Sequence, residues 1–223
     1  MRVLIFGANG RTGQHVVDEA LSRGHHVTAL VRNASSLPPR DKLTIVQGSP
    51  MELSSILAAV EATGPNDKPE AILITLNTAR TSDNPFAKLI SPPRLLTTSV
   101  SNALEAMKQH GIRKIVYLSA FGVGSSYPNM LSAMKLLMRY SNLGKAYEDH
   151  EEAEKVLRAS QVDWVIARPV MLTDKDQAAV LEHGEDGAAA GWVPSISRAS
   201  VASYLIDALG SEKRVGTSLV ISN

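Results

Sequence analysis

Short apolar runs alternate along this chain with stretches whose apolar residues recur at every third or fourth position. Short apolar runs are typical of buried strands, and the longer recurrence is typical of helices. The predicted strands begin at Val3, His26, Leu43, Ala71, Lys114, Trp164 and Ser218. The predicted helices begin at Thr12 or lie near 52–62, 98–110, 150–159 and 201–209. Because the two kinds of element alternate, the pattern predicts an α/β fold with a doubly wound parallel sheet.

Two stretches interrupt this alternation. Residues 77–93 are polar and rich in proline, and residues 121–129 are rich in Gly and Ser. We expect both at the carboxyl ends of strands, where open parallel sheets bind ligands. The sequence thus predicts a single domain over 1–223, with a substrate pocket formed by loops 77–93 and 121–135 and the C-terminal part. For 78–91, an insertion without a binding role is the alternative.

Composition narrows the function classes. At 223 residues, 44% hydrophobic and 20% charged, the chain can bury one sizeable core. The net charge of +1 comes without a basic run, which disfavours nucleic acid as a partner. The absence of Cys excludes disulfides and thiolate chemistry. Because the sequence has neither a signal-peptide pattern nor a membrane-spanning run, we expect a soluble, cytoplasmic monomer or small homo-oligomer without membrane partners.

A glycine-rich turn carries the most specific chemistry. Gly7, Gly10 and Gly13 follow the first predicted strand and open the first predicted helix. In such a turn the glycines permit a tight bend, close approach of backbone N–H groups to a pyrophosphate, and close packing of helix on sheet. The predicted cofactor contacts here are Gly7, Asn9, Gly10, Arg11, Thr12 and Gly13. An ordinary tight turn is the alternative.

The residue after the second strand indicates which dinucleotide binds. NAD-binding folds place an Asp or Glu there, whereas this chain has Arg32. A guanidinium can hold a 2′-phosphate with paired hydrogen bonds, so Arg32 favours NADP(H), and Arg11 adds a second cation. The alternative is that both arginines are solvated surface charges.

Several motifs together resemble the atypical short-chain dehydrogenase/reductases, specifically the small NmrA-like NAD(P)-binding group that includes the biliverdin reductase B and flavin reductase type. The resemblance covers essentially the whole chain. It is specific to the superfamily and does not indicate a substrate. The motifs that carry it are GANGRTG from Gly7, Arg32, LSAFG from Leu118, YEDHEEAE from Tyr147, WVIARP from Trp164 and the segment from Ile196 to Leu209.

The resemblance implies positions for the chemistry. Ser119 corresponds to the serine that lies beside the nicotinamide and bonds a substrate oxygen, and His150 stands where most members have the active-site lysine. Ala146 stands where the catalytic tyrosine would be, as in the members that work without it. The remaining implied cofactor contacts, which also include Ser119 and His150, are Ser49, Leu76, Asn77, Pro169 and Val170.

The chemistry of His150 leaves two roles open. An imidazole titrates near neutrality and could supply a proton as hydride arrives. It could equally hold the helix start or the cofactor ribose without proton transfer. Tyr127 and Tyr147 are further possible donors. A hydrolase is disfavoured because Ser119 lacks the preceding glycine of a nucleophile elbow, and no metal site is expected because His25 and His26 have no acids at ligand spacing.

The leading hypothesis is an NADPH-dependent reductase that transfers hydride to a small, planar, electron-poor acceptor such as a flavin, quinone, enone or imine. One alternative is a non-redox isomerase or cyclase of natural-product biosynthesis that retains NADP(H), which the missing tyrosine favours. A second alternative is an NADP(H) sensor without turnover. Three roles remain open for the methionine-rich stretch 130–138: covering the pocket, packing in the core or forming a surface for a partner.

Overall fold

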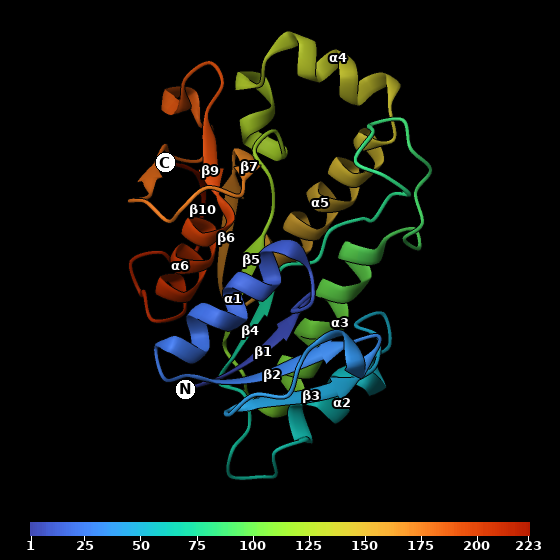
Figure 1. Ribbon diagram of the computed structural model, residues 1–223, viewed down its shortest axis with the longest axis vertical. Helices are drawn as coiled ribbons and strands as arrows, with labels where there is room; N and C mark the ends of the chain where they lie inside the picture. Colours follow the sequence, from blue (N-terminus) through green and yellow to red (C-terminus); the bar gives the residue numbers. More distant parts are fainter.

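The computed structural model describes residues 1–223, which form one eight-stranded sheet with helices on both faces (Figure 1). The strand order is β3-β2-β1-β4-β5-β6-β10-β8, and every pairing is parallel except that of β8 with β10. The strands of this sheet are β1 (Arg2–Phe6), β2 (His26–Val31), β3 (Leu43–Gln47), β4 (Ala71–Ile74), β5 (Lys114–Leu118), β6 (Asp163–Pro169), β8 (Leu181–Glu182) and β10 (Thr217–Ser222). The order reverses between β1 and β4, which marks the ligand crevice of a doubly wound sheet.

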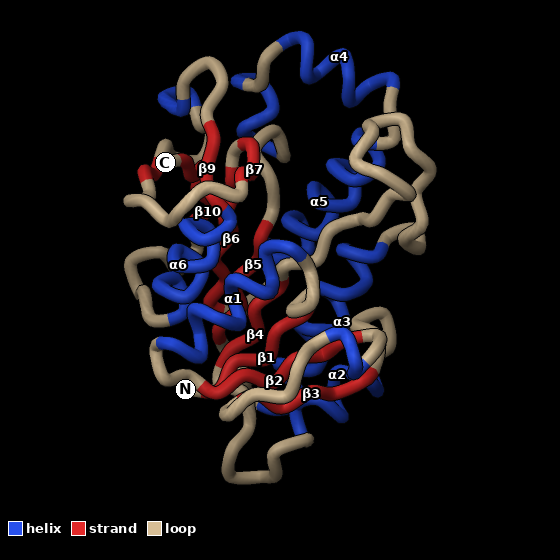
Figure 2. The backbone as a smooth tube through the Cα atoms, viewed as in Figure 1, coloured by secondary structure: helices blue, strands red, loops and turns tan.

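Helices cover both faces of the sheet, as Figure 2 shows by the blue coils on either side of the red strands. Helices α1 and α6 pack together on one face, and α2, α3 and α5 pack on the other. Helix α4 stands apart from the sheet (Figure 1). The helices are α1 (Arg11–Ser22), α2 (Leu53–Glu61), α3 (Leu95–His110), α4 (Ser132–Tyr140), α5 (Leu143–Arg158) and α6 (Arg198–Leu209).

The central strands are buried because a helix layer covers each face. All residues of β1 and β4 are buried, so these strands are apolar throughout rather than alternating. Their side chains divide between two cores: Val3 and Ile5 face α1 and α6, and Leu4 and Phe6 face α2 and α3. This rigid centre fixes where each strand ends, and therefore where the side chains that follow it lie.

The predicted α/β fold is confirmed, and the structure corrects several element boundaries. Helix α3 begins at Leu95 rather than near 98, and α5 begins at Leu143 rather than near 150. Residues 132–135, predicted as part of a pocket loop, belong to helix α4. The early turns of α5 alternate polar and small residues, and α4 leaves most of its apolar side chains exposed, so neither displays a clear buried stripe.

Short strands near the C-terminus were also missing from the prediction. Strands β7 (Met171–Thr173) and β9 (Ser195–Ser197) form a separate two-stranded parallel sheet, and β8 has only two residues. Strands of two or three residues have too few positions for a hydrophobic period, and their pairing depends on chain segments brought together by the fold.

The segment 77–93 is tied to the junction between α4 and α5. The Asn142 backbone N–H donates to the Pro85 carbonyl at 3.0 Å. The Asn142 side chain donates to the carbonyls of Phe86 and Ala87, at 3.2 and 3.1 Å. Within the segment, Arg80 and Leu89 form an isolated antiparallel bridge. This long connection is therefore ordered by its own hydrogen bonds and by α5.

Candidate functional site

The glycine turn after β1 has no room for side chains at two of its three positions. Gly7 has φ of +84°, and a Cβ there would lie 2.9 Å from the Thr75 hydroxyl oxygen. A Cβ on Gly13 would lie 1.9 Å from the Gly7 carbonyl oxygen, because α1 starts directly against the turn. Gly7 thus needs the left-handed conformation and Gly13 needs the missing side chain. These are the roles that the sequence pattern predicts for them.

The first turn of α1 leaves hydrogen-bond donors free. Gly10 is the N-cap and supplies no capping side chain, and no acidic residue lies in the first turn. The first backbone bond into the helix runs from Gln14 N–H to the Gly10 carbonyl at 2.9 Å. The N–H groups of Arg11, Thr12 and Gly13 have no partner in the protein. Together with the positive end of the helix dipole, these donors fit the pyrophosphate of a dinucleotide.

The other predicted cofactor contacts lie along the same edge of the sheet. Arg32 follows β2, is exposed and forms no ion pair in the protein. Ser49 follows β3, where its hydroxyl accepts from the Met51 N–H at 3.3 Å. Leu76 and Asn77 follow β4. Pro169 ends β6, and Val170 comes next. Parallel strands bring all of these residues to one side of the molecule.

An ion pair joins the glycine turn to the segment 77–93. The Arg11 guanidinium lies 3.3 Å from the Asp83 carboxylate, and both side chains are largely exposed. The pair connects the two chain segments that flank the β1/β4 reversal point. An exposed ion pair of this kind contributes little to stability, so Arg11 stays available to a competing anion.

His150 is buried against a tyrosine of the neighbouring strand. Its Nδ1 lies 2.7 Å from the Tyr117 hydroxyl, and only 4% of the histidine is exposed. Burial lowers the pKa of His150 to about 4, although the carboxylates of Glu154 and Asp149 oppose the shift. Burial also raises the pKa of Tyr117 well above its usual value. At neutral pH, therefore, both side chains are uncharged.

Ser119 is part of a buried charged network. Its hydroxyl donates to Glu154 Oε1 at 2.6 Å. Glu154 in turn accepts from Arg168, through Nε at 3.1 Å and through a terminal nitrogen at 2.5 Å. The side chains of Glu154 and Arg168 are 3% and 1% exposed. Arg168 also donates to the Ser125 hydroxyl and the Glu185 carbonyl, so its donors are well satisfied.

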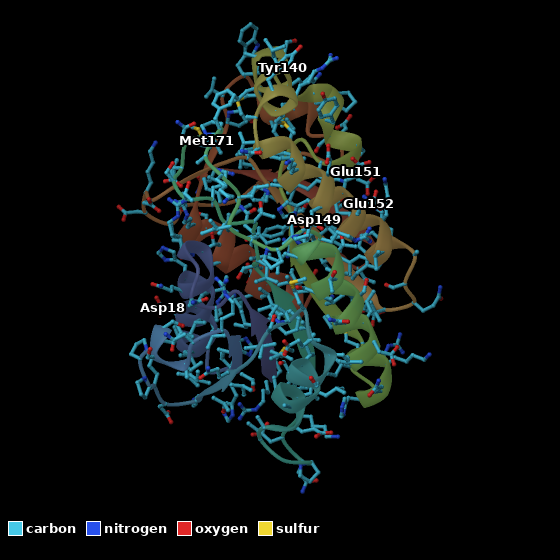
Figure 3. The ribbon with its side chains drawn as sticks, turned by 90° about the vertical axis from the view of Figure 1, so that its right-hand side faces the viewer. Asp18, Tyr140, Asp149, Glu151, Glu152 and Met171 are labelled. Atoms are coloured by element: carbon cyan, nitrogen blue, oxygen red, sulfur yellow. The ribbon has the colours of Figure 1, made fainter.

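Asp149 has a structural role between two helices. Its carboxylate accepts from the backbone N–H groups of Leu96 and Thr97, at 2.9 and 3.0 Å, and from the Thr97 hydroxyl at 2.6 Å. Figure 3 shows Asp149 on α5 beside the start of α3, while its neighbours Glu151 and Glu152 lie on the outer side. The α3 N-cap, Arg94, provides no side-chain bond, so Asp149 caps α3 from another helix.

The segment 77–93 also brings buried polar atoms near α5. Thr78 Oγ1 and Arg80 Nε are buried without a partner in the protein. Burial raises the pKa of Tyr147, and the positive charge of Arg80 opposes that shift. Unpartnered buried polar atoms are rare in folded proteins, and these two lie in the segment predicted to line the substrate pocket.

Sequence reasoning missed two partners of the predicted site residues, Glu154 and Tyr117. Glu154 lies four residues after His150, between the apolar positions Ala153 and Leu157. A carboxylate next to the apolar face of a helix is a sequence signal that it is buried with a partner. Tyr117 lies two residues before Ser119, so both project to the same face of β5. No sequence signal indicates that Thr78 and Arg80 are buried.

The reversed strand order, the crowded glycine turn and the free donors of α1 define a dinucleotide-binding protein of the Rossmann class. The chain belongs to the NAD(P)H-binding family, whose sequence profile matches residues 7–212. This match confirms the expected NAD(P)-binding family and the expected nicotinamide dinucleotide cofactor. No helix has the length and apolar character needed to cross a membrane.

Two relatives are similar to this chain in sequence. A 3-diazoavenalumate denitrifying reductase of a Streptomyces species is 33% identical over 133 residues, which cover 59% of this chain and 42% of that protein. This chain therefore matches less than half of that reductase. An uncharacterized chloroplastic protein of Arabidopsis thaliana is 28% identical over 218 residues, covering 95% of this chain and 73% of that protein.

Solved structures confirm the fold. ChuY, an anaerobillin reductase from Escherichia coli O157:H7, superposes with a TM-score of 0.77 at 21% identity, covering 100% of this chain and 97% of ChuY. A short-chain dehydrogenase/reductase from Veillonella parvula, solved in complex with NADP, gives a TM-score of 0.76 at 18% identity, covering 100% of this chain and 94% of that one.

Proposed function

We propose that this protein is an NADPH-dependent reductase that transfers hydride to a small, planar, electron-poor acceptor such as a flavin, quinone, enone or imine. The observation that carries the proposal is the set of free N–H donors at α1, in a turn that excludes side chains, on the same sheet edge as Arg32, Ser119 and His150. The names of the Streptomyces reductase and of ChuY favour reduction over the alternatives.

The preference for NADPH rests on Arg32. Its side chain is exposed at the end of β2 and has no carboxylate partner. A free guanidinium can form paired, charge-assisted hydrogen bonds with a 2′-phosphate, and a ribose hydroxyl offers no matching charge. The donors of Arg11, Thr12 and Gly13 hold the pyrophosphate at α1.

The bound cofactor supplies the hydride. The protein residues orient the acceptor against the cofactor. With a pKa of about 4, His150 is neutral at pH 7 and serves as a hydrogen-bonding group rather than an acid. The Ser119 proton is held by Glu154. With these two groups unsuited as acids, solvent is the proposed source of the proton that completes the reduction.

Arg32→Ala tests the cofactor assignment. Loss of charge-assisted bonds to the 2′-phosphate should weaken NADPH binding by about tenfold to a hundredfold and leave NADH binding unchanged. Calorimetric titration with both cofactors measures the effect. Arg40→Ala is the matched control, because Arg40 is an exposed arginine of the same region whose partner is Asp18. An unchanged NADPH:NADH preference in Arg32→Ala would contradict the assignment.

Turnover tests the reaction class. The wild-type protein should oxidise one NADPH for each molecule of a flavin, quinone, enone or imine that it reduces, followed by the loss of NADPH absorbance. A substrate that is converted without NADPH loss would instead identify a non-redox enzyme. Tight binding of NADPH without turnover of any acceptor would identify a sensor.

A further inference from the structure

Helix α4 presents apolar side chains on its outward face. Leu136 and Tyr140 are one turn apart, so they lie on the same side of the helix, and they are 59% and 66% exposed. Met138, the one buried residue of α4, lies on the opposite side. Figure 3 shows Tyr140 at the outer end of the molecule, well away from Asp149 on α5. Of the three roles that the sequence leaves open for this stretch, the exposure of these side chains favours a surface for a partner.

The same part of the chain carries positive charge and no negative charge. Lys135 and Arg139 are also one turn apart on α4, beside the apolar face. Lys145 follows in the first turn of α5, and residues 106–147 contain no Asp or Glu. The Arg139 guanidinium carbon lies 5.8 Å from the centre of the Tyr140 ring, which places a cation next to the exposed aromatic side chain. Exposed apolar residues flanked only by cations are typical of helices that bind anionic membrane surfaces.

Two other kinds of partner fit these features less well. In a symmetric dimer through this face, Lys135 and Arg139 of one copy would lie against the same cations of the other copy, and like charges repel. An acidic peptide needs a groove that receives its side chains. Neither the cavity of about 450 Å³ beside α6 nor the cavity of about 210 Å³ beside α5 includes a residue of α4. A projecting apolar helix face instead fits a soft surface into which its side chains can insert.

We propose that α4 docks on the surface of a lipid bilayer that carries anionic headgroups. Leu136 and Tyr140 enter the boundary between headgroups and acyl chains, and Lys135 and Arg139 contact the phosphates. A tyrosine suits this boundary because its ring is apolar and its hydroxyl is polar.

This inference goes beyond the proposed reductase function and does not depend on it, since α4 contributes none of the predicted cofactor contacts. It differs from the expectation of no membrane partner. That expectation rested on the lack of a membrane-spanning run, and a helix that lies in the interface needs no such run.

Co-sedimentation with lipid vesicles tests the surface. The wild-type protein is mixed with vesicles of phosphatidylcholine alone, or of phosphatidylcholine and phosphatidylglycerol in equal parts. We expect the apparent affinity for the anionic vesicles to be at least about tenfold higher than for the neutral ones. Raising the salt concentration from about 0.1 M to about 0.5 M should weaken this binding severalfold, because salt screens the attraction between the cations and the headgroups.

Three variants locate the contact. The double variant Leu136→Ser, Tyr140→Ser should lower the affinity for anionic vesicles by at least about tenfold, because it removes the inserting side chains. Arg139→Glu should lower it by about tenfold, because it reverses a charge at the surface. Lys108→Glu is the matched control: it makes the same charge change at an exposed position in the last turn of α3, and should stay within about twofold of the wild-type protein. Thermal unfolding without lipid checks that each variant is folded.

Equal binding to neutral and anionic vesicles, or no binding to either, would overturn the inference. An equal loss in Arg139→Glu and Lys108→Glu would also overturn it, because the overall charge of the protein would then explain the binding. A dimer that the double variant dissociates, seen by sedimentation velocity without lipid, would identify a second copy as the occupant of this face instead. None of these measurements uses a cofactor or an acceptor, so their failure leaves the proposed function intact. Failure to oxidise NADPH with every acceptor would count against the proposed function alone.

Discussion

At the residue scale, the site is governed by the burial of titratable groups. His150 shows the effect most clearly: the sequence places an imidazole where a proton donor is expected, and burial lowers its pKa to about 4, so that it stays neutral under mildly acidic conditions. Glu154 remains charged because Arg168 accompanies it into the interior. Breaking such a pair costs several kcal/mol, because the remaining charge is left buried alone. A hydroxyl beside the charged carboxylate must donate its proton to it, as Ser119 does to Glu154.

The buried imidazole should make stability depend on pH. The pKa of His150 is about 4 in the folded protein, compared with 6.5 for an ordinary histidine. As the pH falls below 6.5, the unfolded chain binds a proton that the folded protein resists until about pH 4. His150 thus contributes stability above pH 6.5 that is lost as the pH falls towards 4, by about 3 kcal/mol in full. Denaturant unfolding at pH 7 and pH 4.5 should show this loss in the wild-type protein.

The control for this prediction is His150→Gln, which should lose about 2–3 kcal/mol less than the wild-type protein between those two pH values. His15→Gln should behave like the wild-type protein, because His15 is exposed on α1. If His150→Gln and the wild-type protein lose the same amount, the imidazole is not held neutral by burial.

At the element scale, helix ends are stabilised by residues of other elements. The start of α3 has the left-handed Arg94 as its N-cap, with no capping side chain of its own. The N–H groups at this end are instead satisfied by Asp149 of α5. A carboxylate at a helix N-terminus also interacts favourably with the helix dipole. This contact fixes α5 against α3. It therefore also fixes the position of His150, the next residue on α5, relative to β5.

Asp149→Ala should destabilise the fold by about 3 kcal/mol, since it leaves buried donors of Leu96 and Thr97 without partners. Chemical denaturation at pH 7 measures the change. Glu148→Ala, at the exposed neighbouring position, should change stability by less than about 0.5 kcal/mol. A similar small effect for Asp149→Ala would show that water replaces the carboxylate at α3.

At the scale of the whole molecule, the parallel sheet gathers residues that are far apart in the sequence. The turn after β1, Arg32 after β2, Asn77 after β4 and Ser119 after β5 meet at one edge because these strands run in the same direction. The segment 77–93 crosses this edge and joins both the glycine turn and α5. A ligand that binds the folded protein at that edge would stabilise the entire domain.

NADPH at about 100 times its Kd should stabilise the wild-type protein by about 2.7 kcal/mol, which raises Tm by about 5–10 °C. Gly13→Ala should abolish this shift, because its Cβ would collide with the Gly7 carbonyl. Gly210→Ala is the matched control, since φ there is −93° and no atom lies within 4 Å of the added Cβ. Thermal unfolding with and without NADPH measures both. An undiminished shift in Gly13→Ala would place the cofactor away from this turn.

The sequence by itself determined the fold class and the cofactor turn, because both depend on local patterns. Apolar strands such as Val3–Phe6 and the amphipathic helices can be recognised from neighbouring residues, and Gly7 and Gly13 are required by the backbone of one short turn. Only the tertiary structure decided the state of the site residues. The hydrogen bond of His150, the committed proton of Ser119 and the capping role of Asp149 depend on Tyr117, Glu154 and Leu96 respectively, which approach from other elements. Burial and hydrogen-bond direction are properties of those long-range contacts, and no local pattern encodes them.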